Sequence, residues 1–152
     1  MSAQGKFNLD IHLDNESLLS SMESDVLHGL TSNPKQIPPK YFYDDIGSRL
    51  FEQITELPEY YPSRVEATIL VDIADSLMSR FQPQELIEIG SGYSTKTKII
   101  LDSMEKCSNP LRYIPVDVSE EALKHAATIV RDIYPTLEIH AIVGDFEKHL
   151  IH

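Results

Sequence analysis

The residues best suited to chemistry begin at a glycine turn, Gly90-Ser91-Gly92, which directly follows an apolar run over residues 85–89. Such a run predicts a buried strand, and glycines after it let the backbone approach a ligand where a Cβ would collide. The dinucleotide-binding fingerprint needs a third glycine where this chain has Thr95, so a pyrophosphate cradle is not predicted. On its own, the turn suits either a ligand or an ordinary strand-to-helix connection.

Two acidic residues follow further predicted strands and are expected at the same edge of a sheet as the glycine turn. Asp117 ends the strand predicted over residues 112–117, and Asp145 follows the strand predicted over residues 137–143. In open α/β sheets, ligands bind outside the carboxyl ends of the strands. An acid at Asp117 can accept both hydroxyls of a ribose, or it can cap the next helix. We favour the ribose, because Ser119 is better placed as the cap.

Asp145 and four further residues suit other parts of a ligand site, but each also has a plain structural explanation. Asp145 can accept from an exocyclic amine while Phe146 offers a flat face to a base; equally, Asp145 can cap a helix and Phe146 can be core. Lys96 lies in the first helical turn after the glycines, where the helix dipole disfavours a cation, so it suits either a ligand carboxylate or solvent. Tyr43 and Tyr60 suit a pocket or packing, and the residues alone favour packing.

From residue 83 onward the hydrophobic pattern alternates between strand and helix. Strands are predicted over residues 85–89, 112–117 and 137–143, with helices over about 94–105 and 120–133 between them. This alternation predicts an α/β fold with a parallel sheet and right-handed crossovers. Three strands are fewer than the roughly five or six of an average sheet, and the first strand would normally be central. We therefore expect residues 83–152 to be the first half of a longer domain, with an open edge beside its first strand.

The first half of the chain is predicted to be helical after a flexible N-terminal arm. Residues 1–13 are interpreted as lacking periodicity and are assigned to the arm, and residues 14–82 are assigned to a helical region. Within that region, apolar residues recur at helical spacing over about 15–29, 46–57 and 65–78.

The bulk properties argue against polyanionic and membrane partners. The chain has 13 basic and 24 acidic residues, a formal net charge of -11 and no basic run, which argues against a nucleic-acid or anionic-membrane surface. Its single cysteine, Cys107, excludes an intrachain disulfide. The polar N-terminus and the lack of a long apolar stretch predict a cytoplasmic protein. The six histidines show no metal-ligand spacing, so no metal site is predicted.

Five ordered motifs resemble a known enzyme family. They are Tyr41-Phe-Tyr-Asp-Asp-Ile-Gly-Ser-Arg-Leu-Phe51, Leu57-Pro-Glu-Tyr-Tyr-Pro-Ser-Arg64, Glu88-Ile-Gly-Ser-Gly92, Asp117-Val-Ser119 and Val143-Gly-Asp-Phe-Glu147. Their order and spacing resemble the L-histidine Nα-methyltransferase family of ergothioneine biosynthesis, over about residues 38–150. The resemblance implies a Rossmann-like class I methyltransferase fold, of which this chain is the N-terminal part, and S-adenosylmethionine as the cofactor.

The resemblance also implies roles that the pattern alone leaves open. Gly90 and Lys96 would lie along the methionine part of the cofactor, Asp117 would hold the ribose, and Asp145 with Phe146 would hold the adenine. In the family, tyrosines at the places of Tyr43 and Tyr60 line the histidine pocket, which reverses the preference for packing. The helical region over residues 14–82 would thereby contribute to the substrate site.

The implied reaction is the transfer of three methyl groups to the α-amine of L-histidine, which gives hercynine. Such in-line displacement needs approach geometry and a water-poor cavity more than a strong base, and the catalytic residue is unknown. Family members continue well beyond this chain, and much of their histidine site has no counterpart here. The alternative is therefore a non-catalytic cofactor-binding or assembly module, completed by a partner segment or by self-association through the open sheet edge.

Overall fold

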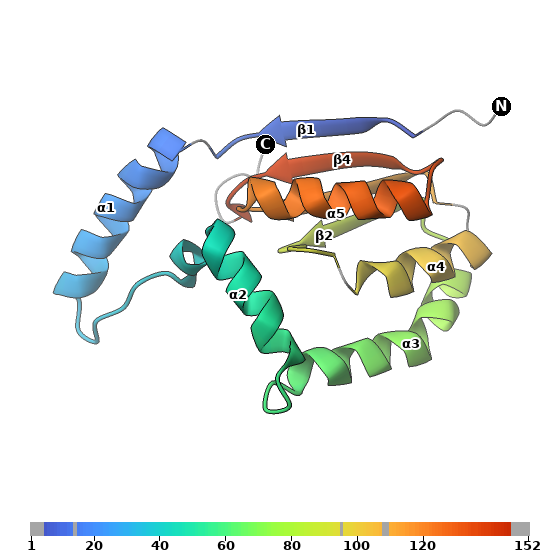
Figure 1. Cartoon of the computed structure of the whole chain (residues 1–152), viewed down its shortest axis with the longest axis horizontal. Helices are drawn as coiled ribbons and strands as arrows, with labels where there is room; N and C mark the ends of the chain where they lie inside the picture. Colours follow the sequence, from blue (N-terminus) through green and yellow to red (C-terminus); the bar gives the residue numbers. More distant parts are fainter. Residues whose placement is uncertain (1–4, 14, 95, 108–109, 147–152) are drawn as a thin grey trace.

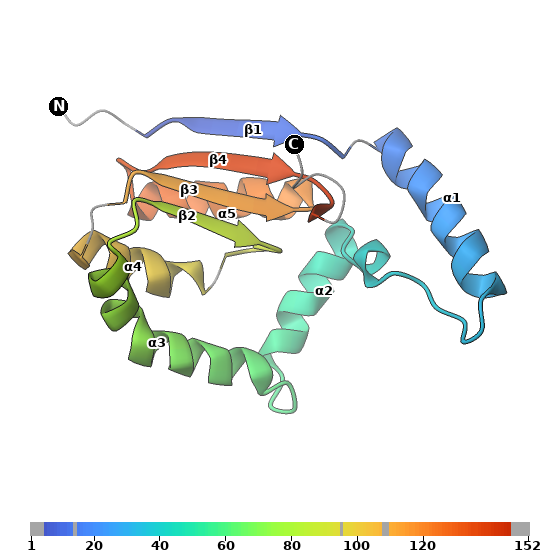
Figure 2. The same cartoon turned by 180° about the vertical axis from the view of Figure 1, so that it is seen from behind.

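The computed structural model describes residues 5–13, 15–94, 96–107 and 110–146, and it contains a sheet of four parallel strands (Figure 1; Figure 2). The strands are β1 (Phe7–Ile11), β2 (Glu85–Ile89), β3 (Arg112–Asp117) and β4 (Glu138–Val143), in the spatial order β1-β4-β3-β2. Helix α4 (Thr97–Cys107) connects β2 to β3, and α5 (Glu120–Ile133) connects β3 to β4. The predicted α/β architecture of Rossmann-like type is therefore confirmed.

The N-terminal segment differs from the expected flexible arm, because residues 7–11 form β1 and add a fourth strand to the expected three. β1 runs parallel to β4, with Phe7 opposite Ile139. Phe7 and Leu9 pack against a buried apolar cluster of α5 and β4. Removing alternate apolar side chains from water stabilises such a strand by about 25 cal/mol per Å² of buried apolar area. The sheet domain thus includes residues from both ends of the described chain.

β2 lies at the opposite edge of the sheet, and no further strand pairs with that edge among the described residues. Ile87 and Ile89 of this strand are 60% and 51% exposed. A strand edge presents unpaired N–H and C=O groups, which can bind a further strand. Within the described residues, the edge beside the glycine-turn strand thus carries no further strand.

Helix α5 covers one face of the sheet, in front of it in Figure 1 and behind it in Figure 2. Its buried residues recur at helical spacing, as an amphipathic helix requires: Ala122, Leu123, Ala126, Ala127 and Val130. The predicted cap is confirmed, since the Ser119 hydroxyl accepts a hydrogen bond from the backbone N–H of Ala122 at 3.2 Å. Glu120 and Glu121 stand in the first turn, where the helix dipole favours acids.

Replacing Ser119 with alanine is expected to lower the free energy of unfolding by about 1 kcal/mol, because it leaves a helix N–H without its acceptor. Urea unfolding followed by circular dichroism measures this change. Thr128→Ala is the matched control, since the Thr128 hydroxyl only donates to the Lys124 carbonyl on the exposed side of the same helix. Equal effects for the two variants would contradict the capping role.

The helical region consists of α1 (Asn15–Thr31), a 3-10 helix η1 (Pro39–Phe42), α2 (Asp45–Glu56) and α3 (Pro62–Phe81). Helices α1 and α2 lie beyond the carboxyl ends of the strands, toward which the arrows point in Figure 1. Asp44 caps α2 by accepting from the backbone N–H of Gly47 at 2.7 Å. None of the helices in the described part of the chain is long and apolar enough to cross a membrane.

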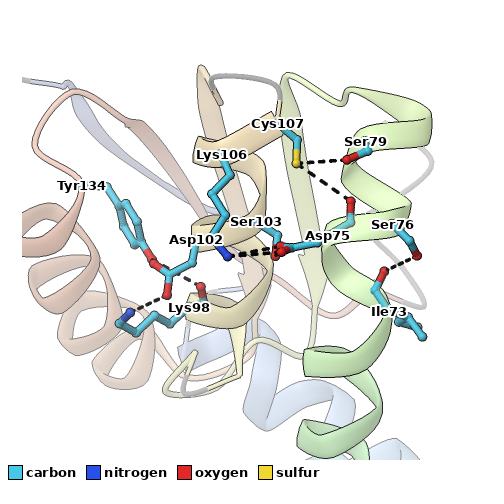
Figure 3. Close-up of polar contacts among 10 residues, drawn as sticks. All are labelled: Ile73, Asp75, Ser76, Ser79, Lys98, Asp102, Ser103, Lys106, Cys107 and Tyr134. Carbon is cyan, nitrogen blue, oxygen red and sulfur yellow. Dashed lines mark hydrogen bonds and ion pairs between the residues drawn. The ribbon is translucent and has the colours of Figure 1, made fainter.

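Helix α3 packs against α4 through the polar contacts in Figure 3. Asp75 of α3 accepts a hydrogen bond from the Ser103 hydroxyl and forms an ion pair with Lys106 at 3.3 Å. These two donors lower the pKa of the Asp75 carboxyl. On α4, Asp102 accepts from the Tyr134 hydroxyl at 2.6 Å, which ties the end of α5 to the same helix. Helix α4 therefore links α3 to the sheet layer.

Candidate functional site

A cavity of about 950 Å³ opens where the strands end and the helical region begins. Ligand pockets are usually of roughly 300–1,000 Å³. Its lining comes from η1, α2 and α3 and from the carboxyl ends of β2, β3 and β4, and it includes Lys40, Tyr43, Phe51, Glu66, Glu88, Gly90, Ser91, Gly92, Lys96, Asp117, Asp145 and Phe146. The cavity thus lies at the edge where open α/β sheets bind ligands.

The glycine turn after β2 presents open backbone to this cavity. Gly90 and Gly92 have φ angles of 69° and 49°, which glycine adopts without the strain that a Cβ would bring. No described atom lies within 4 Å of the position that a Cβ would occupy at either residue. Between them, Ser91 is only 8% exposed, and its hydroxyl has no hydrogen-bond partner within the described structure. Because an unpartnered buried hydroxyl is unfavourable, the turn suits a ligand that supplies the partner.

Asp117, at the end of β3, holds the glycine turn in place. Its Oδ2 accepts from the backbone N–H of Gly92 at 2.8 Å, and its Oδ1 accepts from the backbone N–H of Ser119 at 3.0 Å. Ser119, and not Asp117, caps α5. Each oxygen of a carboxylate can accept more than one hydrogen bond, so these contacts are compatible with ribose binding. The ribose role stays a prediction, now with Asp117 placed directly beside the turn.

Glu88, an acid within the otherwise apolar β2, organises a hydrogen-bond network beside the turn. Its Oε2 accepts from the Tyr113 hydroxyl at 2.5 Å and from the Thr97 hydroxyl at 2.6 Å. Ser94, which ends the turn with a φ of 55°, is hydrogen-bonded to the Tyr113 hydroxyl at 2.7 Å. Burial, followed by the charge of Glu88, raises the pKa of Tyr113, so its hydroxyl stays a donor at neutral pH. The network fixes a strained residue of the turn.

Lys96 lies at the cavity and forms an ion pair with Glu66 of α3. The two side chains are 35% and 57% exposed. Ion pairs between partly exposed side chains contribute little stability, so a ligand carboxylate can compete with Glu66 for the ammonium group. Of the two alternatives for Lys96, the position at the cavity favours a ligand over plain solvation.

The spacing of Ser63 and Glu66 is typical of a capping box, but α3 starts at Pro62 without a side-chain cap.

Asp145 and Phe146 lie side by side at the end of β4, and both line the cavity. Asp145 is buried, with 4% of the residue exposed, while Phe146 is half exposed. The Lys40 ammonium group of η1 donates to the Oδ2 of Asp145 at 2.8 Å. A buried acceptor next to an accessible aromatic ring is an arrangement that suits an adenine. The adenine assignment remains a prediction that this placement supports.

The two tyrosines expected in the substrate pocket both contact Phe51. The Tyr43 ring meets the Phe51 ring edge-on at a centroid distance of 5.7 Å, and the Tyr60 ring does so at 5.9 Å. Tyr43 and Phe51 line the cavity, whereas Tyr60 does not belong to its described lining. The structure therefore brings Tyr43 to the same cavity as the candidate cofactor-binding residues, whereas Tyr60 contacts Phe51 and lies outside the described lining.

The structure thus gathers Gly90, Lys96, Asp117, Asp145, Phe146 and Tyr43 around one cavity, and their individual roles stay predictions. Sequence reasoning missed Lys40, Glu66, Glu88 and the Ser91 hydroxyl. Glu88 had a signal, because an acid inside an apolar strand needs a partner. Among the described residues, no three His, Cys, Asp or Glu side chains are grouped as a metal site would require.

Comparison with known proteins gives a consistent result. Residues 22–152 match the model of a family described as histidine-specific, SAM-dependent methyltransferases. The chain is 45% identical over 139 residues to the histidine N-alpha-methyltransferase of Mycolicibacterium smegmatis and 43% identical over 139 residues to that of Mycobacterium tuberculosis. Each match covers 91% of this chain and 43% of the relative.

A more distant match is the ergothioneine biosynthesis protein 1 of Schizosaccharomyces pombe, which is 36% identical over 121 residues. That match covers 76% of this chain and 16% of the relative. The chain therefore spans less than half the length of each of these three relatives. The family match, the ordered motifs and the cavity at the strand ends lead to one conclusion: the chain belongs to the family of SAM-dependent, histidine-specific methyltransferases.

Proposed function

We propose that this chain provides the cofactor site of an S-adenosylmethionine-dependent methyltransferase that acts on the α-amino group of L-histidine and adds three methyl groups. The observation that carries the proposal is the meeting, in one cavity, of the open glycine turn with an unpartnered Ser91 hydroxyl and two strand-end carboxylates. The family match and the names of the relatives supply the reaction class and the substrate.

The residues around the cavity fit the parts of this cofactor. Gly90 and Lys96 would hold the methionine part, with the ammonium group of Lys96 on its carboxylate. Asp117 would accept from the ribose hydroxyls, and Asp145 with Phe146 would take the adenine. When bound, S-adenosylmethionine supplies an electrophilic methyl group on a sulfonium.

The chain's own residues would shape the approach of the amine. Tyr43 and Tyr60 are the candidates for the histidine side: Tyr43 lines the cavity together with residues of α2 and the start of α3, and Tyr60 packs against Phe51, which also lines it. With histidine bound, these rings would help to exclude water and to hold the amine in line with the methyl group. The residue that takes the amine proton is unknown, and no step of the proposal depends on its identity.

The proposal is tested by incubating the 152-residue chain with S-adenosylmethionine and L-histidine and measuring the product by mass spectrometry. We expect species that carry one, two and three added methyl groups, and none with L-phenylalanine, which lacks the imidazole nitrogens. Calorimetric titration with S-adenosylhomocysteine runs in parallel. If the chain binds neither S-adenosylmethionine nor S-adenosylhomocysteine, the proposed function is wrong.

A second candidate function rests on the edge of β2 with which no described strand pairs, and on the exposure of Ile87 and Ile89 in this strand. Here the chain would be a cofactor-binding or assembly module that pairs this edge with a partner segment or with a second copy. Cofactor binding without turnover would favour it. In sedimentation equilibrium, Ile87→Lys should then abolish concentration-dependent dimers, whereas Lys98→Ala on the exposed side of α4 should not.

A further inference from the structure

The Lys40 ammonium group lies between two carboxylates from distant parts of the chain. Its Nζ is 2.8 Å from the Oδ2 of Asp145, at the end of β4, and 3.4 Å from the Oδ2 of Asp25, in α1. The side chains of Lys40 and Asp145 are 17% and 6% exposed. Lys40 also lines the cavity, next to Asp145 and Phe146.

The lysine is charged and held in position. Burial by itself would lower the pKa of Lys40, but the hydrogen bond and the charge of Asp145 outweigh it and raise that pKa. The following residue, Tyr41, donates to the same Asp25 oxygen at 2.6 Å, and burial together with this bond raises the pKa of Tyr41 to about 12. Pro38 and Pro39 restrict the backbone immediately before the lysine. Lys40 is therefore a fixed cation rather than a mobile surface side chain.

The effect on Asp145 follows from charge and geometry. A buried carboxylate is expensive to desolvate unless a cation or several donors stabilise its charged form. The bond from Lys40 supplies a cation and also fixes the direction of Oδ2, and hence the plane of the whole carboxylate. A carboxylate fixed in this way accepts from an exocyclic amine but repels a carbonyl oxygen at the same place.

We propose that Lys40 is a positioning residue that holds Asp145 as an acceptor for the exocyclic amine of the base and so makes the site selective for adenine. This inference rests on the proposed function and extends it to a residue outside the glycine turn and the strand ends. Lys40 does not itself need to touch the cofactor. The contribution of Lys40 to the site is measured as the ratio of the affinities for a ligand with adenine and for the same ligand with hypoxanthine.

The test compares S-adenosylhomocysteine with S-inosylhomocysteine, in which a 6-oxo group replaces the amine. Calorimetric titration gives both dissociation constants for the unaltered chain and for Lys40→Met and Lys40→Gln. The unaltered chain should prefer the adenosyl ligand by at least about tenfold. Each Lys40 variant should weaken adenosyl binding by about tenfold and inosyl binding by less than about twofold. Lys124→Gln, an exposed lysine of α5 paired with Glu120, is the matched control.

A double-mutant cycle separates positioning from a general structural role. In an Asp145→Asn background, Lys40→Gln should change the adenosyl-to-inosyl ratio no further, because the positioned group is gone. If a Lys40 variant weakens both ligands equally, or leaves the ratio unchanged, the inference is wrong. If Lys40→Met fails to fold, as thermal unfolding would show, Lys40→Gln carries the same comparison. Failure of the unaltered chain to bind either ligand contradicts the proposed function instead.

Discussion

Replacement of Asp117 by alanine is expected to weaken binding of S-adenosylmethionine at least a hundredfold. The carboxylate does two things: it accepts from the backbone N–H of Gly92, which shapes the turn, and it is placed to accept from the ribose hydroxyls. Hydrogen bonds to a charged group are each worth about 1.5–3 kcal/mol, and a loss of roughly 3 kcal/mol corresponds to more than a hundredfold in the dissociation constant. Isothermal titration calorimetry measures the change.

The matched control for Asp117→Ala is Glu120→Ala, which removes a carboxylate three residues further along, at the start of α5 and paired with Lys124. It should leave the affinity within about twofold and the fold intact. Asp117→Asn adds a finer comparison, since an amide keeps one acceptor oxygen and should retain part of the affinity. Wild-type affinity in Asp117→Ala would refute the ribose assignment.

Tyr113→Phe is expected to lower the free energy of unfolding by about 1.5–3 kcal/mol and to weaken cofactor binding as well. The substitution keeps the buried ring but removes the donor to Glu88 and the partner of Ser94. A carboxylate that loses one of its donors in a buried environment pays the desolvation penalty. Ser94 ends the glycine turn in a left-handed conformation. Without its hydrogen bond to the Tyr113 hydroxyl, the turn should become more mobile. Urea unfolding and calorimetry measure the two effects.

The Tyr113 hydroxyl also makes the free energy of unfolding depend on pH in the alkaline range. The folded-state pKa of Tyr113 is raised above the value of about 10 for an unfolded chain, so its contribution to stability is present below pH 10 and is lost as the pH rises further. Stability should therefore fall less steeply above pH 10 in Tyr113→Phe than in the unaltered chain. Tyr61→Phe is the control, because Tyr61 is 64% exposed. An unchanged alkaline slope in Tyr113→Phe would contradict the buried network.

The parts of the site that the sequence predicts correctly are those set by local pattern and by one rule of sheet topology. The apolar run before Gly90 predicts a strand, and the strands before Asp117 and Asp145 follow from the same periodicity. Parallel strands bring their carboxyl ends to one edge, so three separate segments converge without knowledge of any contact. The cap at Ser119 is equally local, because a helix start carries its own signal.

The parts that escape prediction depend on contacts between segments far apart in the chain. Lys40 meets Asp145 across 105 positions and Lys96 meets Glu66 across 30, and no spacing rule connects such residues. β1 is different, because Phe7, Leu9 and Ile11 do alternate with polar residues. That alternation is a strand signal in its own right, which the assignment to an arm overlooked, and β4 provides the neighbour against which the segment pairs.

The most direct measurement is a two-dimensional ¹H–¹⁵N spectrum of the labelled 17.2 kDa chain, recorded during titration with S-adenosylhomocysteine. We expect the largest amide shifts at Gly90, Ser91 and Gly92 and at the strand ends around Asp117 and Asp145. The amides of β1, at the far edge of the sheet, should stay in place and serve as the internal control. Saturable shifts confined to other surfaces, or no shifts at millimolar ligand, would contradict a cofactor site at the carboxyl ends of β2, β3 and β4.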